Sequence, residues 1–263
     1  MNTPADILAA AAAGRRITMV TCYDSWSARI IAATDIDLIL VGDSVAMVVH
    51  GHTTTIPADL DMMCLHTAAV RRGAPEGRII ADMPFLAHRK GLAETVTAVE
   101  RLVRAGAQAV KLEGADGNIE TIRHVVESGV GVMGHLGLTP QSIHKLGGFR
   151  VQARDHAAAA KLLEDALALQ EAGCFALVLE CVPSTLAREV TEALHIPTIG
   201  IGAGPHTSGQ VLVLQDLLGV DPSFRPRFVR TYLDGHSLIR EALEAYDRDV
   251  KAGAFPSDEE SFS

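Results

Sequence analysis

The feature that most constrains the fold is an alternation of short β-branched segments with segments of helical periodicity. Seven β-branched segments are clear and an eighth is weaker; they cover residues 17–24, 37–44, 78–85, 109–114, 130–137, 176–182 and 196–204, then 210–216. Strands that are apolar on both faces and separated by helices are typical of a parallel sheet with right-handed crossovers. The number of units predicts a (β/α)8 barrel, with an open doubly wound sheet as the less favoured alternative.

The helical segments support this prediction. In residues 92–105 the apolar side chains recur at steps of three or four, at Leu92, Val96, Val99 and Val103, and Gly106 should end the helix. The opening segment "PADILAAAAAG" is expected to cover the bottom of the barrel, and a further amphipathic helix is expected from His236. No linker or low-complexity tract interrupts the chain, so we expect one domain over residues 1–263.

Composition excludes several classes of protein. A net charge of -9 argues against binding to nucleic acid or to an anionic membrane. The N-terminus lacks the basic start of a signal peptide, and no uncharged apolar run reaches the roughly 18 residues of a membrane span. The four cysteines have no paired CxxC spacing, which favours reduced core thiols in a cytoplasmic protein and argues against zinc; they are Cys22, Cys64, Cys174 and Cys181.

Polar side chains gather at the C-terminal ends of the expected strands. They are Asp24, Asp43 with Ser44, Asp82, Lys111 with Glu113, His135 and Glu180. In a parallel barrel these ends converge on one mouth, where barrel enzymes place their chemistry. Strand alternation should place Asp43 on the face of Val41, and Lys111 on the face of Glu113. Any single carboxylate could instead be a helix N-cap or a loop ion pair, but their convergence favours a functional site.

The chemistry of these groups indicates a hard metal ion. Carboxylates without a soft ligand nearby suit Mg²⁺ in an oxygen shell, and Lys111 would suit a carboxylate or enolate oxygen of a substrate.

Other polar motifs carry less weight. We expect "HGH" (50–52) to belong to a mobile lid rather than a metal site, and "GIGAG" (200–204) to form a strand-to-helix turn with room for a ligand. His66 and His124 are expected to be surface or packed residues, and the acidic end "SDEESFS" to be solvated.

Longer motifs carry a resemblance to a known family. They are "TCYD", "VGDS", "HTAAV", "ADMPF", "AVKLEG", "VMGHLGLTPQS", "GGFRVQ", "LVLECVP", "IPTIGIGAG" and "FPSDEESF". In order and spacing the chain resembles the ketopantoate hydroxymethyltransferase family of pantothenate biosynthesis over nearly its whole length. The resemblance implies a barrel of the phosphoenolpyruvate/pyruvate type, a Mg²⁺ ion and 5,10-methylenetetrahydrofolate as the one-carbon donor. It also implies a homo-oligomer, typically a decamer.

The resemblance also implies roles for individual residues. Asp43, Asp82 and Glu113 match the metal-binding set. Asp43, Ser44, Asp82 and Lys111 match the keto-acid contacts, and His135 matches a further pocket residue. Glu180 of "LECVP" matches the catalytic base. The sequence departs from the family pattern at Ser208 of "TSGQ", at "EGAD" and in residues 86–99; we expect these departures to lie in loops around the mouth.

The resulting hypothesis is an enolate mechanism. An α-keto acid would chelate Mg²⁺, Glu180 would remove its C3 proton, Lys111 would add positive charge, and the enolate would attack the methylene carbon of the folate donor. A Mg²⁺-dependent lyase or decarboxylase of the same superfamily is the nearest alternative. A non-catalytic metal-binding barrel is the alternative from another class, and a retained base argues against it.

Overall fold

The computed structural model describes residues 4–224 and 226–262. The chain divides into two compact units, Met1–Val213 and Leu214–Ser263, and each is described by itself. Whether residues 1–263 behave as one domain stays a prediction.

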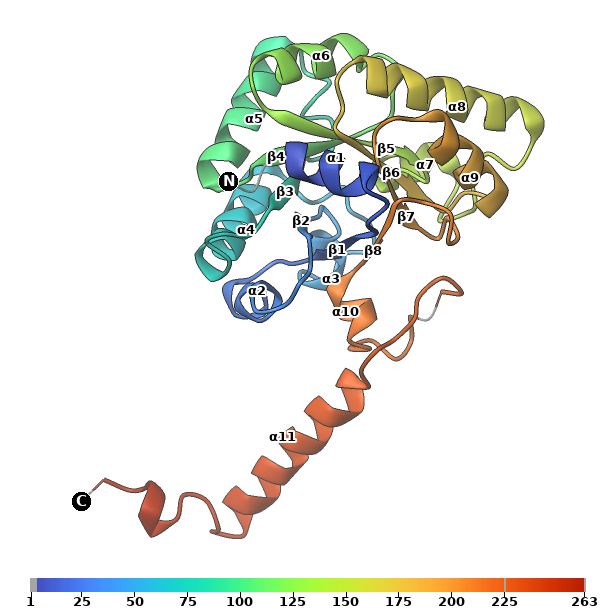
Figure 1. The fold of residues 1–263 in the computed structure, drawn as a ribbon. Coiled ribbons are helices and arrows are strands. Elements are labelled where there is room, and N and C mark those ends of the chain that lie inside the picture. The colour runs from blue at the N-terminus through green and yellow to red at the C-terminus, as the bar shows by residue number, and fades with distance from the viewer. Residues whose placement is uncertain (1–3, 225, 263) are drawn as a thin grey trace. The chain divides into compact units, whose positions relative to one another are not determined.

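The first unit is a closed barrel of eight parallel strands in sequence order, with β8 pairing β1. This confirms the predicted fold (Figure 1). The strands are β1 (Ile17–Thr21), β2 (Leu38–Val41), β3 (Ile79–Asp82), β4 (Ala109–Glu113), β5 (Gly131–Gly137), β6 (Ala176–Glu180), β7 (Thr198–Ile201) and β8 (Gly209–Leu212). Each observed strand lies within or beside its expected segment, and most end earlier than the β-branched run suggested.

Helices connect most of the strands. They are α1 (Pro4–Ala12), α2 (Ser25–Ala32), α3 (Val45–Val48), α4 (Leu60–Gly73), α5 (Leu92–Ala105), α6 (Ile119–Glu127), η1 (Pro140–Ser142), α7 (Ile143–Leu146), α8 (His156–Glu171) and α9 (Ser184–Ala193). As expected, Gly106 ends α5 in the left-handed conformation, with φ of 118°.

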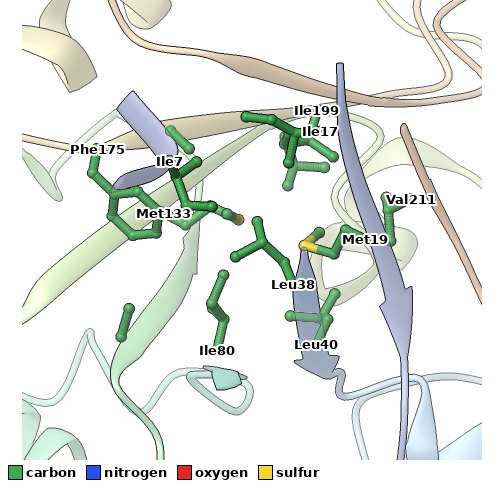
Figure 2. Close-up of a cluster of buried hydrophobic side chains, with 13 residues drawn as sticks. Ile7, Ile17, Met19, Leu38, Leu40, Ile80, Met133, Phe175, Ile199 and Val211 are labelled. Carbon is green, nitrogen blue, oxygen red and sulfur yellow. The ribbon is translucent and has the colours of Figure 1, made fainter. Parts of the chain in front are cut away.

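The barrel interior is filled by apolar side chains from alternate strand positions. Leu38 and Leu40 of β2, Ile80 of β3 and Met133 of β5 belong to this cluster (Figure 2). Ile7 of α1 is 1% exposed and joins them. Because its partners include Ile17, at the start of β1, α1 covers the N-terminal end of the barrel as predicted.

The buried face of α5 differs from the expected one. The helix buries Thr95, Ala98, Val99 and Leu102. Leu92, Val96 and Val103 are 46%, 38% and 37% exposed. The buried face thus combines Val99 and Leu102 with the smaller Thr95 and Ala98, and part of the expected apolar stripe lies on the surface.

The "GIGAG" segment also differs from its expected structure. Residues 202–208 connect β7 directly to β8, with no helix between them. A Cβ at Gly204 would lie 2.3 Å from the Ser184 Cβ, and one at Gly200 would lie 2.7 Å from the Thr207 Oγ1. These two glycines therefore make room for neighbouring parts of the chain rather than for a ligand.

Ser208 lies at the starting ends of strands and not around the mouth. Its carbonyl accepts from the Ile17 N–H, and its hydroxyl accepts from the Thr198 N–H. Ile17 and Thr198 are the first residues of β1 and β7. The expectation that this departure lies in a mouth loop was therefore wrong.

The second unit contains α10 (Leu214–Leu217), α11 (Gly235–Lys251) and η2 (Asp258–Glu260). The Asp234 side chain caps α11 by accepting from the Ser237 N–H, which confirms the helix expected near His236. Residues 257–262 are exposed, as expected for the acidic end.

Within the described ranges, no helix is both long and apolar enough to cross a bilayer. The four cysteines are free thiols; Cys22 and Cys174 are buried.

Candidate active site

Lys111 and Glu113 lie on the inward face of β4, at the end opposite to α1. They share that face with Ala109 of the interior cluster, and they are 5% and 6% exposed. Lys111 pairs in register with Asp82, the last residue of β3. Its Nζ lies 2.9 Å from the Asp82 Oδ1, which makes a buried ion pair. The two charged side chains of β4 are therefore part of one polar cluster above the apolar interior.

Asp43 enters the same cluster by a different route from the predicted one. Leu38 and Leu40 face the interior, so Val41 faces outward and alternation alone would carry Asp43 with it. The strand ends at Val41, and after the turn at Gly42 the Asp43 N–H donates to the Asp82 Oδ2 at 3.0 Å. The expected proximity of the two carboxylates was right, but the alternation argument for it was wrong.

His135 links the cluster to Glu180. The register places His135 beside Glu113 and Val178, and Gly137 beside Glu180. The His135 Nδ1 lies 3.2 Å from the Lys111 Nζ, and its Nε2 lies 3.2 Å from the Glu180 Oε2. The Glu180 side chain is 18% exposed, whereas that of His135 is 2% exposed. Glu180 is therefore the rim member of the group.

The backbone around Glu180 is tightly determined. The Leu138 N–H donates to the Glu180 carbonyl at 2.8 Å, and a Cβ at Gly137 would lie 2.2 Å from that oxygen. Gly137 also has a φ of 93°, so it is required here for both space and conformation. Cys181, the next residue after Glu180, has a φ of 47°. Strain of this kind in a non-glycine residue persists only where the surroundings fix it, and it turns the chain away directly after the carboxylate.

Ser44 is held at the edge of the cluster by Tyr23. The two hydroxyls are 2.7 Å apart, and Tyr23 is 1% exposed. Burial raises the pKa of Tyr23, so its hydroxyl stays neutral and can donate to Ser44. Tyr23 belongs to "TCYD" but was not singled out in the sequence.

Asp24, in the same motif, does not join the cluster. Its carboxylate accepts from the Ser27 N–H at 2.8 Å and caps α2. The interpretation of Asp24 as a mouth residue was therefore wrong, and the N-cap alternative holds.

Gln141 is a member of the cluster that the sequence did not reveal. It lies in η1 after β5 and is 7% exposed. Its backbone N–H donates to the Glu113 Oε2 at 3.1 Å. Its side-chain Nε2 donates to the Asp43 Oδ2 and to the Met83 carbonyl, each at 2.8 Å. Gln141 thus joins two carboxylates that the strands alone do not connect.

The cluster carries excess negative charge in buried surroundings. Burial, and then the charges of Asp82 and Glu113, raise the pKa of Asp43 well above its usual value. Burial also raises the pKa of Asp82, although Lys111 acts in the opposite direction. Burial disfavours the charged form of Lys111, but the three surrounding carboxylates outweigh it and raise its pKa. One ammonium group faces three carboxylates, so a further cation would be electrostatically favoured.

The polar atoms of the cluster fit an oxygen-binding cation in part. The buried Glu113 Oε1 accepts no hydrogen bond and faces the His135 Nδ1 at 3.5 Å, which leaves it available as a ligand. Among the described residues, however, no three His, Cys, Asp or Glu side chains are already gathered around one point. The assignment of Asp43, Asp82 and Glu113 to a metal therefore stays a prediction.

Two histidines outside the cluster contact each other at its edge. The His50 Nε2 and the His66 Nε2 are 2.9 Å apart, and the His66 Nδ1 donates to the Tyr23 carbonyl at 2.6 Å. His66 is thus held by a specific contact, while His124 is exposed on α6. Whether residues 50–52 act as a lid stays a prediction.

Solved structures with the same fold include enzymes of low sequence identity. A 2,3-dimethylmalate lyase, described as a PEP mutase/isocitrate lyase superfamily member, matches with a TM-score of 0.64 at 18% identity over 98% of this chain and 91% of that one. A phosphonopyruvate hydrolase, in complex with oxalate and Mg²⁺, matches with a TM-score of 0.63 at 13% identity over 98% and 93%. At these identities the likeness shows the barrel fold alone.

Sequence relatives are much closer. Proteins named 3-methyl-2-oxobutanoate hydroxymethyltransferase match from Bdellovibrio bacteriovorus, at 59% identity over 95% of both chains, and from Coxiella burnetii, at 58% identity over 97% of this chain and 96% of that one. A protein of the same name from Legionella pneumophila is 54% identical over 94% and 95%. The ketopantoate hydroxymethyltransferase family model matches residues 2–258. Since both comparisons span nearly all of the barrel that carries the cluster, the chain belongs to the ketopantoate hydroxymethyltransferase family.

Proposed function

We propose that this cluster catalyses the reaction for which the family is named, the addition of a hydroxymethyl group to 3-methyl-2-oxobutanoate to give ketopantoate. The observation that carries the proposal is the buried group of Asp82, Lys111 and Glu113 with Glu180 at its rim, in a chain that matches the family over residues 2–258. The one-carbon donor is proposed to be 5,10-methylenetetrahydrofolate, which fits a hydroxymethyl transfer.

Asp43, Asp82 and Glu113 would hold a Mg²⁺ ion. Three carboxylates provide the oxygen ligands that this ion prefers, and the Glu113 Oε1, which accepts no hydrogen bond, supports the fit. When bound, the ion would supply positive charge beside the keto oxygen of the substrate, where negative charge develops as the C3 proton leaves.

Glu180 is proposed as the base that accepts the C3 proton. It is the most exposed carboxylate of the group, and its Oε2 lies 3.2 Å from the His135 Nε2. Lys111 is 3.2 Å from the other ring nitrogen, Nδ1. A proton on the His135 Nε2 faces Glu180, and His135 orients the base through this contact.

Lys111 and Ser44 are proposed to hold the substrate. The Lys111 ammonium is buried beside Asp82, so its charge is poorly screened and acts strongly on an enolate or carboxylate oxygen. The Ser44 hydroxyl already accepts or donates within its pair with Tyr23 and has further hydrogen-bonding capacity for a ligand.

The alternatives are less well supported. A lyase or decarboxylase on the same barrel would fit the solved structures. The two solved structures described above, however, are only 18% and 13% identical to this chain. The relatives described above, at 54–59% identity, are named for hydroxymethyl transfer. A non-catalytic scaffold would have no use for Glu180.

Self-association and location are further parts of the proposal. Apolar side chains lie exposed on α2 and α5 and would suit contact with other copies of the chain; they are Trp26, Ile30, Leu92, Val96 and Val103. We propose a homo-oligomer, a decamer by the family resemblance, which light scattering after size exclusion would test. The free cysteines favour a reducing compartment such as the cytoplasm.

An activity assay tests the function directly. Purified chain should convert 3-methyl-2-oxobutanoate and 5,10-methylenetetrahydrofolate to ketopantoate when Mg²⁺ is present, and a chelator should stop the reaction. Product formation from another keto acid alone, with carbon–carbon bond cleavage, would favour the lyase alternative and overturn the proposal.

A further inference from the structure

We propose that Gln141 is a positioning residue that makes the acidic cluster selective for Mg²⁺ over Ca²⁺. The inference rests on the proposed function, because it assumes that Asp43 and Glu113 bind a metal ion. It goes beyond the proposed function because it assigns a role to the neutral Gln141, whose N–H groups donate to oxygens of both carboxylates.

The first step concerns the oxygens that Gln141 occupies. Each carboxylate has two oxygens that could contact a cation. Gln141 donates its amide N–H to the Asp43 Oδ2 at 2.8 Å and its backbone N–H to the Glu113 Oε2 at 3.1 Å. The other oxygen of Glu113, Oε1, accepts no hydrogen bond and lies 3.5 Å from the His135 Nδ1. Each of these two carboxylates therefore keeps only one oxygen, the Asp43 Oδ1 and the Glu113 Oε1, outside the contacts with Gln141.

The third carboxylate is restrained in a similar way by other groups. The Asp82 Oδ2 accepts from the Asp43 N–H at 3.0 Å, and its Oδ1 lies 2.9 Å from the Lys111 Nζ. Both oxygens of Asp82 are therefore engaged, so a cation in this cluster would meet one oxygen of Asp43 and one of Glu113 that Gln141 does not occupy. Two of the three carboxylates, those of Asp43 and Glu113, are restrained by the same residue, Gln141.

The orientation of the Gln141 amide is fixed by its second donor. One Nε2 proton goes to the Asp43 Oδ2 and the other to the Met83 carbonyl, also at 2.8 Å. A flipped amide would place its oxygen against two acceptors, which the hydrogen-bond pattern forbids. Gln141 is also only 7% exposed, so water does not readily replace these donors. The Asp43 Oδ2 is therefore held by a rigid contact.

Mg²⁺ and Ca²⁺ respond differently to such a restraint. Mg²⁺ keeps a compact octahedral shell with several waters and accepts one oxygen from each carboxylate. Ca²⁺ takes six to eight oxygens and often uses both oxygens of one carboxylate. A cluster in which the second oxygens are taken by N–H donors therefore favours the smaller ion. Releasing the Asp43 Oδ2 should favour Ca²⁺.

The test compares Gln141→Met with wild type and with Gln170→Met. Methionine keeps the length of the side chain but has no N–H donor, and the backbone N–H to Glu113 remains. Gln170 accepts from the His195 N–H near the end of α8, before the start of β6, whereas Glu180 is the last residue of β6, so its variant controls for the same substitution at the other end of the barrel. MgCl2 and CaCl2 are titrated separately into the metal-free full chain, with affinity read from calorimetry and from the rise in Tm.

We expect the ratio of Mg²⁺ to Ca²⁺ affinity to fall by about tenfold in Gln141→Met, the size of one lost charge-assisted hydrogen bond. It should stay unchanged in Gln170→Met. Should Gln141→Met fail to fold, Gln141→Asn tests the same point, because its shorter amide cannot span the distances to Asp43 and Met83.

Two results would overturn the inference while leaving the proposed function in place. One is an unchanged affinity ratio in the folded variant, and the other is an equal loss of affinity for both ions, which would make Gln141 a general structural support. A wild-type chain that binds neither ion overturns the metal assignment itself, and the inference with it, so the two failures can be told apart.

Discussion

Glu180→Gln provides the most direct test of the mechanism. Glutamine has nearly the size and shape of glutamate, and its amide oxygen can still accept a hydrogen bond from the His135 Nε2, which lies 3.2 Å from the Glu180 Oε2. What the variant loses is the capacity to accept a proton. The binding of the keto acid should persist, because the proposed substrate contacts come from Lys111 and Ser44.

The size of the effect follows from general-base catalysis and from the exposure of the side chain. Removing a general base costs about 10²–10⁴-fold in rate. The Glu180 side chain is 18% exposed, so in the variant water can reach this position and serve as a weak base. We therefore expect the lower part of the range, about 10²–10³-fold, or about 3–4 kcal/mol of transition-state stabilisation.

The assay isolates proton removal from the one-carbon transfer. In deuterated water with Mg²⁺ and no folate, wild-type enzyme should exchange the C3 hydrogen of 3-methyl-2-oxobutanoate, which proton NMR follows directly. Glu189→Gln, an exposed change on α9, is the matched control and should exchange at the wild-type rate. Exchange at the wild-type rate in Glu180→Gln would refute the assignment of Glu180 as the base and make His135 the next candidate for that role.

That alternative base has a physical weakness. Burial and the Lys111 charge disfavour protonation of His135, but its contacts with the Glu113 and Glu180 carboxylates outweigh them and raise its pKa to about 9. At neutral pH the ring is then already protonated and cannot accept the C3 proton. Glu180 is the better candidate on this ground as well as on exposure.

Three further perturbations test other parts of the structure. Lys111→Met should weaken keto-acid binding by about 2–4 kcal/mol in calorimetry, since a buried charge-assisted contact is lost, and normal binding would mean that Lys111 does not face the substrate. Asp43→Ala should abolish Mg²⁺-dependent turnover while circular dichroism shows an intact barrel; activity that survives both this change and a chelator would contradict the metal assignment. Asp37→Asn should lower the free energy of unfolding at pH 7 by about 1–2 kcal/mol in urea titrations, because the Asp37 carboxylate accepts from the Thr18 N–H and pairs with Arg15. Burial opposes ionisation of Asp37, but these contacts lower its pKa, so the stabilisation is present above the unfolded pKa of about 3.9 and is lost as the pH falls through the lower folded value. The difference between variant and wild type should therefore shrink on acidification, and a constant difference would count against the ionic contribution.

The sequence predicted the fold well because each strand carries its own local pattern. The pleat alternates side chains, so Ala109, Lys111 and Glu113 had to share a face, and the structure confirms this. The same rule failed at Asp43, which comes after the end of its strand. Once the chain turns at Gly42, the two-residue period no longer decides where a side chain points.

Asp24 shows a second limit of sequence patterns. An aspartate after a strand can serve a catalytic mouth or cap the next helix, and both uses produce the same local sequence.

The α5 helix shows a third limit. Its apolar period was real, but the residues buried are Thr95, Ala98, Val99 and Leu102. Ala98 and Leu102 are also apolar, so the period alone did not decide which of two overlapping stripes is buried.

Gln141 was missed because its partners are distant along the chain and its side chain is neutral. Asp43 and Glu113 lie 98 and 28 residues away. One local signal was nevertheless present. Pro140 opens η1 and has no N–H, so the N–H of Gln141 is among the first donors of that turn, and such donors lack partners within the helix. Because the turn follows directly on the end of β5, these donors face the barrel mouth, where carboxylates are the available acceptors. A polar residue next to a helix-opening proline after a barrel strand is therefore a candidate for orienting the charged groups that the strand ends supply.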